Sequence, residues 1–247
     1  MNSSELQRLT LIGGGSCRLL WPDPVTQAEP ALVVMLTAIA GINDYIVGRA
    51  KDLATVGYTV AMLDYFGREG AVPDISTPQM IGEAVAALDD RRVLADLAEI
   101  LEWARSAGFP LSKTGLLGFC IGGTYAALAA AQHAVGCGVD YYGRLDYASR
   151  TARKPVAPVD VAASLKAPLL CHYGDWDRLV SREEIDGFVS QLRAAQKPYE
   201  LFIYQGAPHA FDEWFRPAVF RPAASSAAWQ RTRTFLNWHL RGHANAH

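Results

Sequence analysis

Short apolar runs alternate along the chain with longer segments of helical periodicity. The apolar runs have the length and composition of strands that are buried on both faces of a sheet. They lie at residues 31–36 (ALVVML), 59–63 (TVAML), 115–119, 136–142, 168–172 (PLLCH) and 200–204 (ELFIY). The helical segments lie at residues 43–56, 90–106, 124–134, 181–195 and 224–240. This alternation predicts an α/β fold, with a mostly parallel central sheet and helices on both faces.

Cap and stop residues support two of these helices. Asn43 is a suitable N-cap for the first helix, and Gly57 follows its expected end. Ser181 and Glu184 have the spacing of a capping box, in which the two side chains bond to each other's backbone N–H. Asn43 and Ser181 thus place the two helix starts at the positions where the helical periodicity also begins.

The rest of the chain shows no division into parts. Residues 70–88 and 143–161 are the least regular stretches, and we expect them to be surface loops. Neither an internal repeat nor a low-complexity linker interrupts the sequence. We therefore predict a single domain over residues 1–247, with its core at about 31–240.

One long segment, from Thr114 to Val139, contains no Asp, Glu, Lys or Arg. It is longer than the roughly 18 apolar residues that make a membrane-spanning candidate. Glycines interrupt it, however, and a lipid-spanning helix would hold Gln132 and His133 in hydrocarbon. We interpret the segment as a strand, a turn, a helix and a second strand at the centre of the core, and expect no membrane association.

Composition narrows the functional classes further. Among 247 residues, 23 Lys and Arg stand against 25 Asp and Glu, the net charge is −2, and half of the residues are apolar. This charge lacks the basic footprint of a nucleic-acid-binding protein, and this apolar content excludes general disorder. Four cysteines without C-x-x-C spacing argue against a disulfide scaffold or zinc site. With no export signal in the first residues, we expect a cytoplasmic protein that uses no metal or organic cofactor.

Candidate chemistry begins at Cys120, in the sequence GFCIGG at residues 118–123. A residue on a sharp strand-to-helix turn needs small neighbours two positions away on each side, and Gly118 and Gly122 supply them. The turn would raise the sulfur above the sheet and aim the Ile121 amide at the group under attack. The motif by itself is equally compatible with a small buried cysteine that has no chemical role.

Two later loops supply the base and the acceptor that a thiol nucleophile needs. Asp175 and Asp177 follow the strand predicted at 168–172, and His209 follows the next one. The order of nucleophile, acid and histidine is that of the α/β-hydrolases, in which the site lies beyond the carboxyl ends of the strands. We predict Asp177 as the acid, with Asp175 as the alternative, because Asp often accepts backbone hydrogen bonds within its own turn.

These features resemble the dienelactone hydrolase family, the cysteine-nucleophile branch of the α/β-hydrolases. The resemblance extends from about Ala31 to Leu240. Its motifs are G-x-C-x-G-G at residues 118–123, Y-Y-G at 141–143, a G-x-x-D loop at 174–177 and A-x-H-x-F at 207–211. It implies an α/β-hydrolase fold and a triad of Cys120, His209 and Asp177.

The resemblance also implies residues that bind the substrate. The oxyanion amides carry over to Ile39 and Ile121, and Arg68 in D-x-x-x-R would hold a substrate carboxylate. We further expect three aromatic residues to line the pocket, although core packing explains them too. They are Tyr142, Trp176 and Phe211.

Two departures from the family pattern concern charge. The family has a glutamate before the aliphatic oxyanion residue, where this chain has Ala38. It has a second carboxylate-binding arginine four residues past the histidine, where this chain has Glu213. We expect both changes to disfavour the anionic dienelactone itself.

The sequence therefore predicts a hydrolase of a small ester or lactone that forms a thioester on Cys120. We expect a small-molecule substrate, no nucleic-acid partner, and a monomer or homodimer. One alternative is a cysteine amidohydrolase or peptidase of the DJ-1/glutaminase type, although the late Asp177 and His209 loops favour the hydrolase. Another is a catalytically silent ligand-binding or redox-sensing protein on the same fold.

Overall fold

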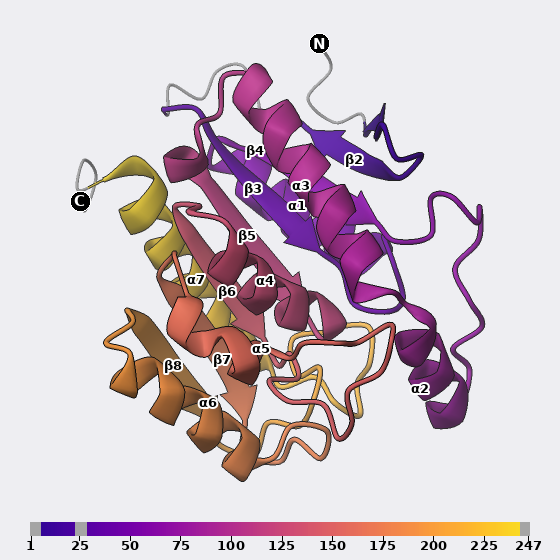
Figure 1. Ribbon diagram of the computed structural model, residues 1–247, viewed down its shortest axis with the longest axis vertical. Coiled ribbons are helices and arrows are strands. Elements are labelled where there is room, and N and C mark those ends of the chain that lie inside the picture. The colour runs from indigo at the N-terminus through magenta and orange to yellow at the C-terminus, as the bar shows by residue number, and fades with distance from the viewer. Residues whose placement is uncertain (1–5, 23–28, 243–247) are drawn as a thin grey trace.

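The structure, a computed structural model, describes residues 6–22 and 29–242. Within them, eight strands form one sheet in the order β1-β2-β4-β3-β5-β6-β7-β8 (Figure 1). The strands are β1 (Gln7–Thr10), β2 (Ser16–Leu20), β3 (Ala31–Leu36), β4 (Tyr58–Asp64), β5 (Thr114–Phe119), β6 (Cys137–Tyr141), β7 (Leu169–Gly174) and β8 (Tyr199–Tyr204). β1 and β2 pair antiparallel with their neighbours, and the remaining six strands are parallel.

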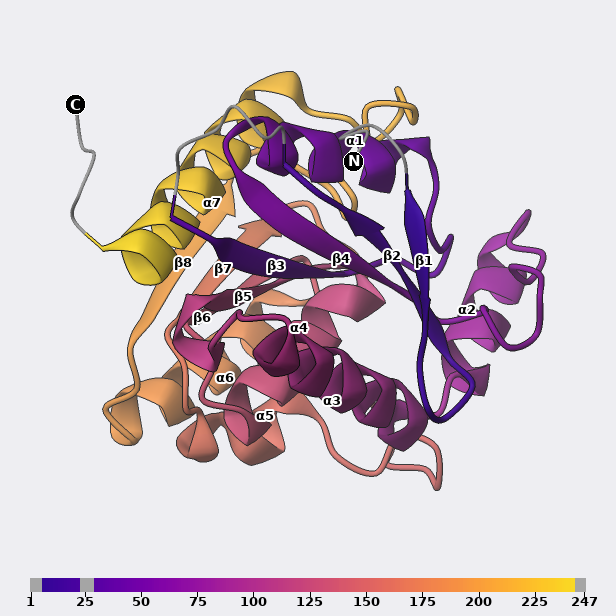
Figure 2. The same cartoon turned by 90° about the horizontal axis from the view of Figure 1, so that it is seen from above.

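Helices cover both faces of the sheet (Figure 2). They are α1 (Asp44–Thr55), α2 (Pro78–Ala87), α3 (Asp90–Ser106), α4 (Ile121–Gln132), α5 (Pro158–Val161), α6 (Arg182–Ala194) and α7 (Pro222–Arg241). α1 and α7 lie on one face and α3 to α6 on the other, while α2 stands to the side of the sheet in both views. The predicted α/β architecture is confirmed.

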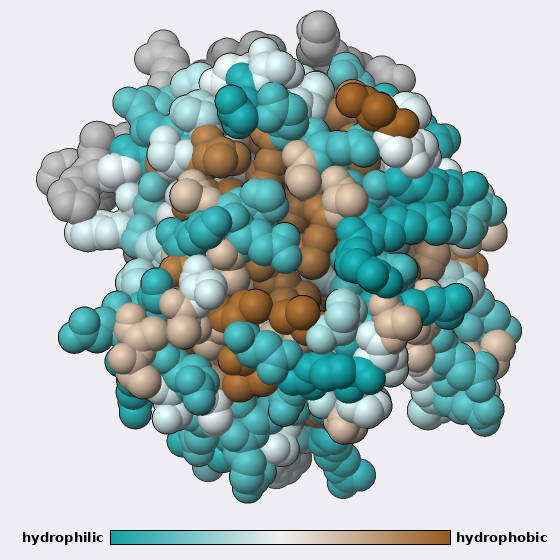
Figure 3. All heavy atoms as spheres, in the orientation of Figure 1, coloured by the Kyte–Doolittle hydropathy of each residue, from teal (hydrophilic) through white to brown (hydrophobic). Residues whose placement is uncertain are grey.

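The uncharged segment forms the most buried part of the fold. All of β5 is buried, as are the residues of α4 from Ile121 to Ala131. A helix that is apolar all round must be enclosed, and α4 lies between the sheet and its neighbours α3 and α5. The outer surface of this layer is mostly polar, with an apolar band between the polar side chains (Figure 3). None of the helices in the described ranges combines the length and apolarity that a membrane span requires.

The six predicted strands and five predicted helices are present, with small shifts at their ends. α3 has the predicted bounds, and the Asn43 side chain caps α1 by accepting from Ile46 N–H. The capping box of α6 is only half formed. Ser181 accepts from Glu184 N–H, but the Glu184 carboxylate accepts from the backbone of the loop after β6, at the N–H groups of residues 145 and 146.

Three features were not predicted. The stretch 143–161, expected to be a loop, ends in the short helix α5. The stretch 70–88 contains α2, which Thr77 caps and Pro78 opens, so a loop throughout was the wrong expectation. β1 and β2 also went unrecognised because they are short, and β1 is largely exposed. These two strands form because β1 pairs with β2 and β2 pairs with β4. No local sequence pattern reveals this pairing.

The register of the central strands decides which loop residues become neighbours. Leu36 on β3 lies opposite both Leu63 on β4 and Gly118 on β5. Phe119 on β5 lies opposite Tyr141 on β6. The residues that follow these four strands therefore stand side by side along the carboxyl edge, where ligand sites of parallel sheets form.

Candidate active site

The sharp turn expected at Cys120 is present between β5 and α4. Cys120 has φ 55° and ψ −122°, a backbone conformation that non-glycine residues rarely adopt and that clusters at functional sites. The turn is held on both sides, because Cys120 N–H donates to Tyr141 O and Cys120 O accepts from Gly123 N–H, each at 2.9 Å. The side chain is partly exposed at the N-terminus of α4, where the helix dipole favours an anion.

Close approach of three elements explains the glycines around Cys120. A Cβ on Gly122 would lie 2.7 Å from Thr37 O and closer still to the last carbonyl of β3. A Cβ on Gly118 would lie 2.6 Å from Gly123 N and would overlap the carbonyl of Gly122. Small residues at both positions are therefore required by the packing of β3 and α4 around the turn.

The acid and the histidine meet at the ends of β7 and β8. Asp177 Oδ2 lies 2.8 Å from His209 Nδ1, and the Asp177 side chain is fully buried. Its other oxygen, Oδ1, accepts from the N–H groups of Leu179 at 2.7 Å and Val180 at 3.0 Å. These two bonds fix the carboxylate so that Oδ2 faces the imidazole.

Asp175 takes a different part in the same loop. Its Oδ1 accepts from Gly206 N–H at 2.6 Å, which joins the loops after β7 and β8. Asp175 therefore accepts a backbone hydrogen bond from the neighbouring loop, where the sequence suggested one within its own turn, and Asp177 is the carboxylate that contacts His209.

The charge state of His209 depends on its two neighbours. Burial lowers the pKa of His209, but the Cys120 sulfur and the Asp177 carboxylate outweigh burial and raise this pKa to about 10. His209 Nε2 is buried and has no hydrogen-bond partner within residues 6–22 and 29–242. A histidine with this pKa keeps, at neutral pH, the proton that it takes from the thiol, so His209 beside Cys120 has the arrangement of the base in a cysteine–histidine pair.

The other histidine and cysteines near the sheet are structural. His172 on β7 bonds to Thr232 Oγ1 at 3.1 Å and to Tyr204 OH at 3.0 Å, and burial lowers its pKa to about 3. Burial also raises the pKa of the three remaining thiols, which are inaccessible. They are Cys17, Cys137 and Cys171.

Comparison with known proteins identifies the family of the chain. The pattern of the dienelactone hydrolase family matches residues 19–240. The chain belongs to this family. The Bradyrhizobium sp. protein named "Probable 2-oxo-3-(5-oxofuran-2-ylidene)propanoate lactonase" is 45% identical over 230 residues, which are 92% of each chain. The carboxymethylenebutenolidase of Rhodococcus opacus is 33% identical over 84% of this chain and 81% of its own.

A solved structure supports the same assignment. The Klebsiella pneumoniae crystal structure named "Putative Dienelactone Hydrolase" has a TM-score of 0.85 and 26% identity, covering 94% of this chain and 98% of that chain. The dienelactone hydrolase family and its α/β-hydrolase fold, both expected from the motifs, are therefore confirmed. Membership places the chain among hydrolases of carboxylic ester bonds.

The two departures from the family pattern have different surroundings. Ala38 is buried, 7% exposed, and carries no charge into the site. Glu213 is also buried, but Arg216 Nη1 lies 2.9 Å from its Oε2. The anion that replaces the family arginine is therefore compensated within its own loop.

Arg68, expected to hold the substrate carboxylate, is bound by the protein itself. Its two terminal nitrogens contact the carboxylate of Asp96, and its Nε donates to Gly13 O at 2.9 Å. Asp96 is buried on α3, so this pair ties the turn after β4 to α3 and to the β1–β2 turn. With its charge neutralised there, Arg68 is not part of our proposed site.

The other expected residues lie at the carboxyl edge. Ile39 follows β3 and Ile121 opens α4, where the first N–H groups of a helix have no intrahelical acceptor. Tyr142 is fully buried, and its ring lies 5.0 Å from the His209 ring and 5.4 Å from the Phe211 ring. Phe211 is itself fully buried, so it packs against Tyr142 and does not face solvent.

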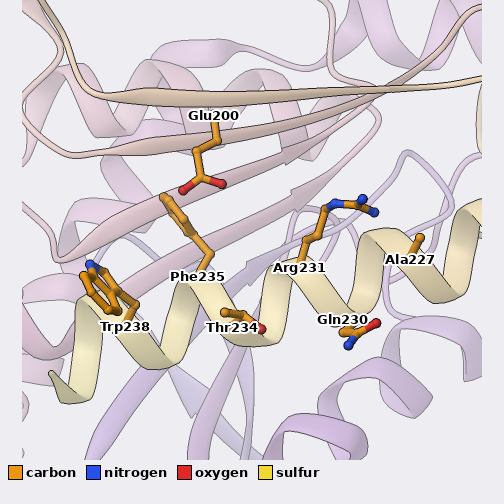
Figure 4. A pocket seen from close by; sticks show the side chains of 7 residues that line it. All are labelled: Glu200, Ala227, Gln230, Arg231, Thr234, Phe235 and Trp238. Carbon is orange, nitrogen blue, oxygen red and sulfur yellow. The ribbon is translucent and has the colours of Figure 1, made fainter. Parts of the chain in front are cut away.

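A cavity of about 770 Å³ opens beside His209. Trp176 and Leu179 form apolar walls, and Arg178 and Arg216 also line it. Another cavity, of about 580 Å³, lies between β8 and α7, where Glu200 faces Phe235 (Figure 4). None of the predicted site residues lines this second cavity.

Sequence reasoning missed two hydroxyl groups near Cys120, those of Thr37 and Tyr65. Both are buried, and each directly follows a strand at the carboxyl edge, Thr37 after β3 and Tyr65 after β4. That position in the sequence was the available signal. It went unused because Tyr65 is a variable position of D-x-x-x-R and Thr37 is not a specified position of any motif.

Proposed function

We propose that this protein hydrolyses a small lactone or ester with Cys120 as nucleophile, His209 as base and Asp177 as the residue that orients His209. The observation that carries the proposal is the Asp177–His209 contact of 2.8 Å at the edge where Cys120 occupies its strained turn. Three residues from three separate loops have the relative roles that a thiol nucleophile requires.

The reaction follows from the position of each group. His209 Nε2 takes the Cys120 proton, and the resulting thiolate attacks the ester carbonyl carbon. The amides of Ile39 and Ile121 receive the negative charge on the carbonyl oxygen. When the tetrahedral intermediate collapses, the C–O bond breaks and His209 gives its proton to the leaving oxygen.

Water completes the cycle. His209 removes a proton from a water molecule, whose oxygen attacks the thioester carbonyl. The C–S bond breaks, the acid product departs, and Cys120 returns to its starting form. Asp177 remains ionised throughout and stabilises the imidazolium that forms twice in each cycle.

The relatives suggest the substrate class. Two of them are named for lactones, a 5-oxofuran-2-ylidene propanoate and a carboxymethylenebutenolide. Because His209 protonates the leaving oxygen, the leaving part of the substrate must lie beside His209, where the 770 Å³ cavity opens. The apolar walls of Trp176 and Leu179 with the cation of Arg178 suit a short unsaturated arm that carries a carboxylate.

Hydrolysis of 4-nitrophenyl acetate and of a γ-alkylidene butenolide tests the proposal. We expect Cys120→Ala to lower kcat/KM by about 10³-fold or more. The matched control is Cys171→Ala, which removes a buried thiol and should leave the rate within a few-fold. Iodoacetamide should alkylate wild-type Cys120, and more slowly in His209→Ala.

Each contrary result has a definite meaning. Equal hydrolysis by wild type and Cys120→Ala would remove Cys120 as the nucleophile. Alkylation that is unchanged in His209→Ala would disprove the Cys120–His209 pairing. Alkylation of Cys120 without turnover of any ester would favour the silent ligand-binding or redox-sensing alternative.

A further inference from the structure

Several buried polar groups around Cys120 lack a partner. In residues 6–22 and 29–242, the buried side-chain atoms without a hydrogen bond include Thr37 Oγ1, Tyr65 OH, Tyr142 OH and His209 Nε2. The others are Ser16 Oγ, opposite Asp64 on the outer neighbouring strand of the same edge, and atoms of Tyr58 and Arg241 at the opposite end of β4. Buried polar groups almost always have a hydrogen-bond partner. Four buried atoms without one around a single residue therefore indicate that a ligand supplies the partner.

Strand register brings these groups together. Residues after β4, β3, β5 and β6 are adjacent because Leu63, Leu36, Gly118 and the residues beside them pair across the sheet. Tyr65, Thr37, Cys120 and Tyr142 thus form a row along the carboxyl edge. The closeness of Thr37 to the turn is also seen in its carbonyl, which a Cβ on Gly122 would approach to 2.7 Å.

The hydroxyl groups in this row are donors at neutral pH. Burial raises the pKa of Tyr65 well above its ordinary value; the neighbouring Thr37 hydroxyl, which lies outside hydrogen-bond geometry, partly offsets this, and Cys120 adds to it. The pKa of Tyr142 is raised in the same way, chiefly by burial. Both phenols therefore keep their protons and can donate to an acceptor that enters the site.

The order of the strands divides the site into two halves. Asp177 and His209 follow β7 and β8, on one side of β5, and the leaving oxygen must face them. Thr37 and Tyr65 follow β3 and β4, on the other side. The acyl part of the substrate, which remains on Cys120 after the first step, therefore extends toward Thr37 and Tyr65.

The charged groups near this half are held by the protein itself. Arg68 is bound to Asp96, and the Asp64 carboxylate accepts from Phe66 N–H at 3.1 Å. Ala38 adds no charge. The acyl half therefore presents neutral donors to its ligand.

We propose that Tyr65 and Thr37 form an acyl-side subsite that donates hydrogen bonds to a second oxygen of the acyl group, beyond the scissile carbonyl. The subsite rests on the proposed function, because it takes Cys120 as the nucleophile. Neighbouring strands are about 4.8 Å apart, so an oxygen on the third carbon beyond the scissile carbon of an open-chain ester lies at the right reach. In a γ-butenolide that oxygen is the leaving oxygen, which faces His209, so the subsite concerns open-chain acyl groups. The subsite selects acyl chains with a ketone or carboxylate oxygen there over plain alkyl chains.

The test compares three 4-nitrophenyl esters that share one leaving group. The pentanoate has no second oxygen, the levulinate has a 4-oxo group, and the hemisuccinate has a terminal carboxylate. For wild type we expect kcat/KM for the levulinate or the hemisuccinate to exceed that for the pentanoate by about tenfold, because one otherwise unpaired donor is satisfied. Which of the two is preferred distinguishes a ketone from a carboxylate as the acceptor.

Two variants assign the preference to the subsite. Tyr65→Phe and Thr37→Val should each reduce this preference, measured as a ratio of rates within one variant, to about twofold or less. Tyr58→Phe is the control, since it removes another buried and unpartnered phenol from the same strand at its other end. A merely structural role would lower all three rates together and leave their ratios unchanged.

The outcomes separate this inference from the proposed function. Hydrolysis of the pentanoate without any preference for a second oxygen would overturn the subsite alone. A preference that survives in both Tyr65→Phe and Thr37→Val, or that Tyr58→Phe removes equally, would also overturn it. If Cys120→Ala hydrolyses the esters as fast as wild type, the proposed function fails and the subsite with it.

Discussion

Replacing Asp177 by Asn tests the proposed catalytic arrangement at its most constrained point. Asp177 Oδ1 accepts from two backbone N–H groups, and Oδ2 faces His209 Nδ1. In the variant, the amide oxygen must occupy the Oδ1 position to keep both backbone bonds. The amide NH₂ then faces Nδ1, which selects the tautomer with its proton on Nε2, and that nitrogen cannot accept the Cys120 proton.

The magnitude follows from the hydrogen bonds involved. Flipping the amide restores the productive tautomer but breaks two backbone bonds, which costs about 2 kcal/mol. Losing the charged acceptor for the imidazolium costs about 2 kcal/mol more. Together, about 4 kcal/mol lowers kcat by about a thousandfold. Because an anion is removed, the pKa of His209 also falls from its raised value of about 10.

The assay is hydrolysis of 4-nitrophenyl acetate over a range of pH, with Asp175→Asn as the matched control. Asp175 lies two residues earlier and bonds to Gly206 N–H, so its variant should keep most of the wild-type kcat. Wild-type kcat in Asp177→Asn would refute the tautomer argument. An equal loss in both variants would show that the loop as a whole, rather than the His209 contact, is responsible.

Two further predictions concern the fold. Gly122→Ala brings a Cβ to 2.7 Å from Thr37 O, which should cost about 1–3 kcal/mol of stability in urea unfolding and abolish hydrolysis. Gly187→Ala on α6 has nothing within 4 Å and should stabilise by about 0.5–1 kcal/mol, so equal effects would contradict the steric explanation. Burial lowers the pKa of His172 from 6.5 to about 3, so stability should fall as the pH drops below 6.5, by about 2–3 kcal/mol at pH 4.5. His172→Gln should flatten this dependence in unfolding curves between pH 4.5 and 7, and an unchanged slope would assign the acid sensitivity to other groups.

Local patterns in the sequence were enough to predict the layers of the fold. The helix at 90–106 was predicted with the bounds of α3, because its apolar spacing and Asp at its start act within the segment itself. The uncharged segment between Thr114 and Val139 was assigned to the core because its glycines exclude a spanning helix. α2 was missed because its first-turn proline and mixed surface resemble a loop, and β1 was missed because an exposed edge strand has no apolar run.

The candidate site depended on the sequence for its residue types and on the tertiary structure for its contacts. The turn at Cys120 was recognisable because the glycines that it requires all lie within one stretch of six residues, 118–123. Asp175 and Asp177, in contrast, follow the same strand, and only the packing of the loops after β7 and β8 decides which carboxylate meets His209. Arg68 has the expected spacing, yet Asp96 on α3 neutralises it.

What the sequence by itself determined, then, is the succession of the six parallel strands and of five helices along the chain, the family, and the chemical types available at the carboxyl edge. These properties arise from short-range periodicity and motifs, which act over a few residues. What only the tertiary structure decided is which charges are free and which hydroxyls are left without partners. Tyr65 and Thr37 meet near Cys120 because β4, β3 and β5 pair in register, and strand pairing joins residues that are far apart in the chain.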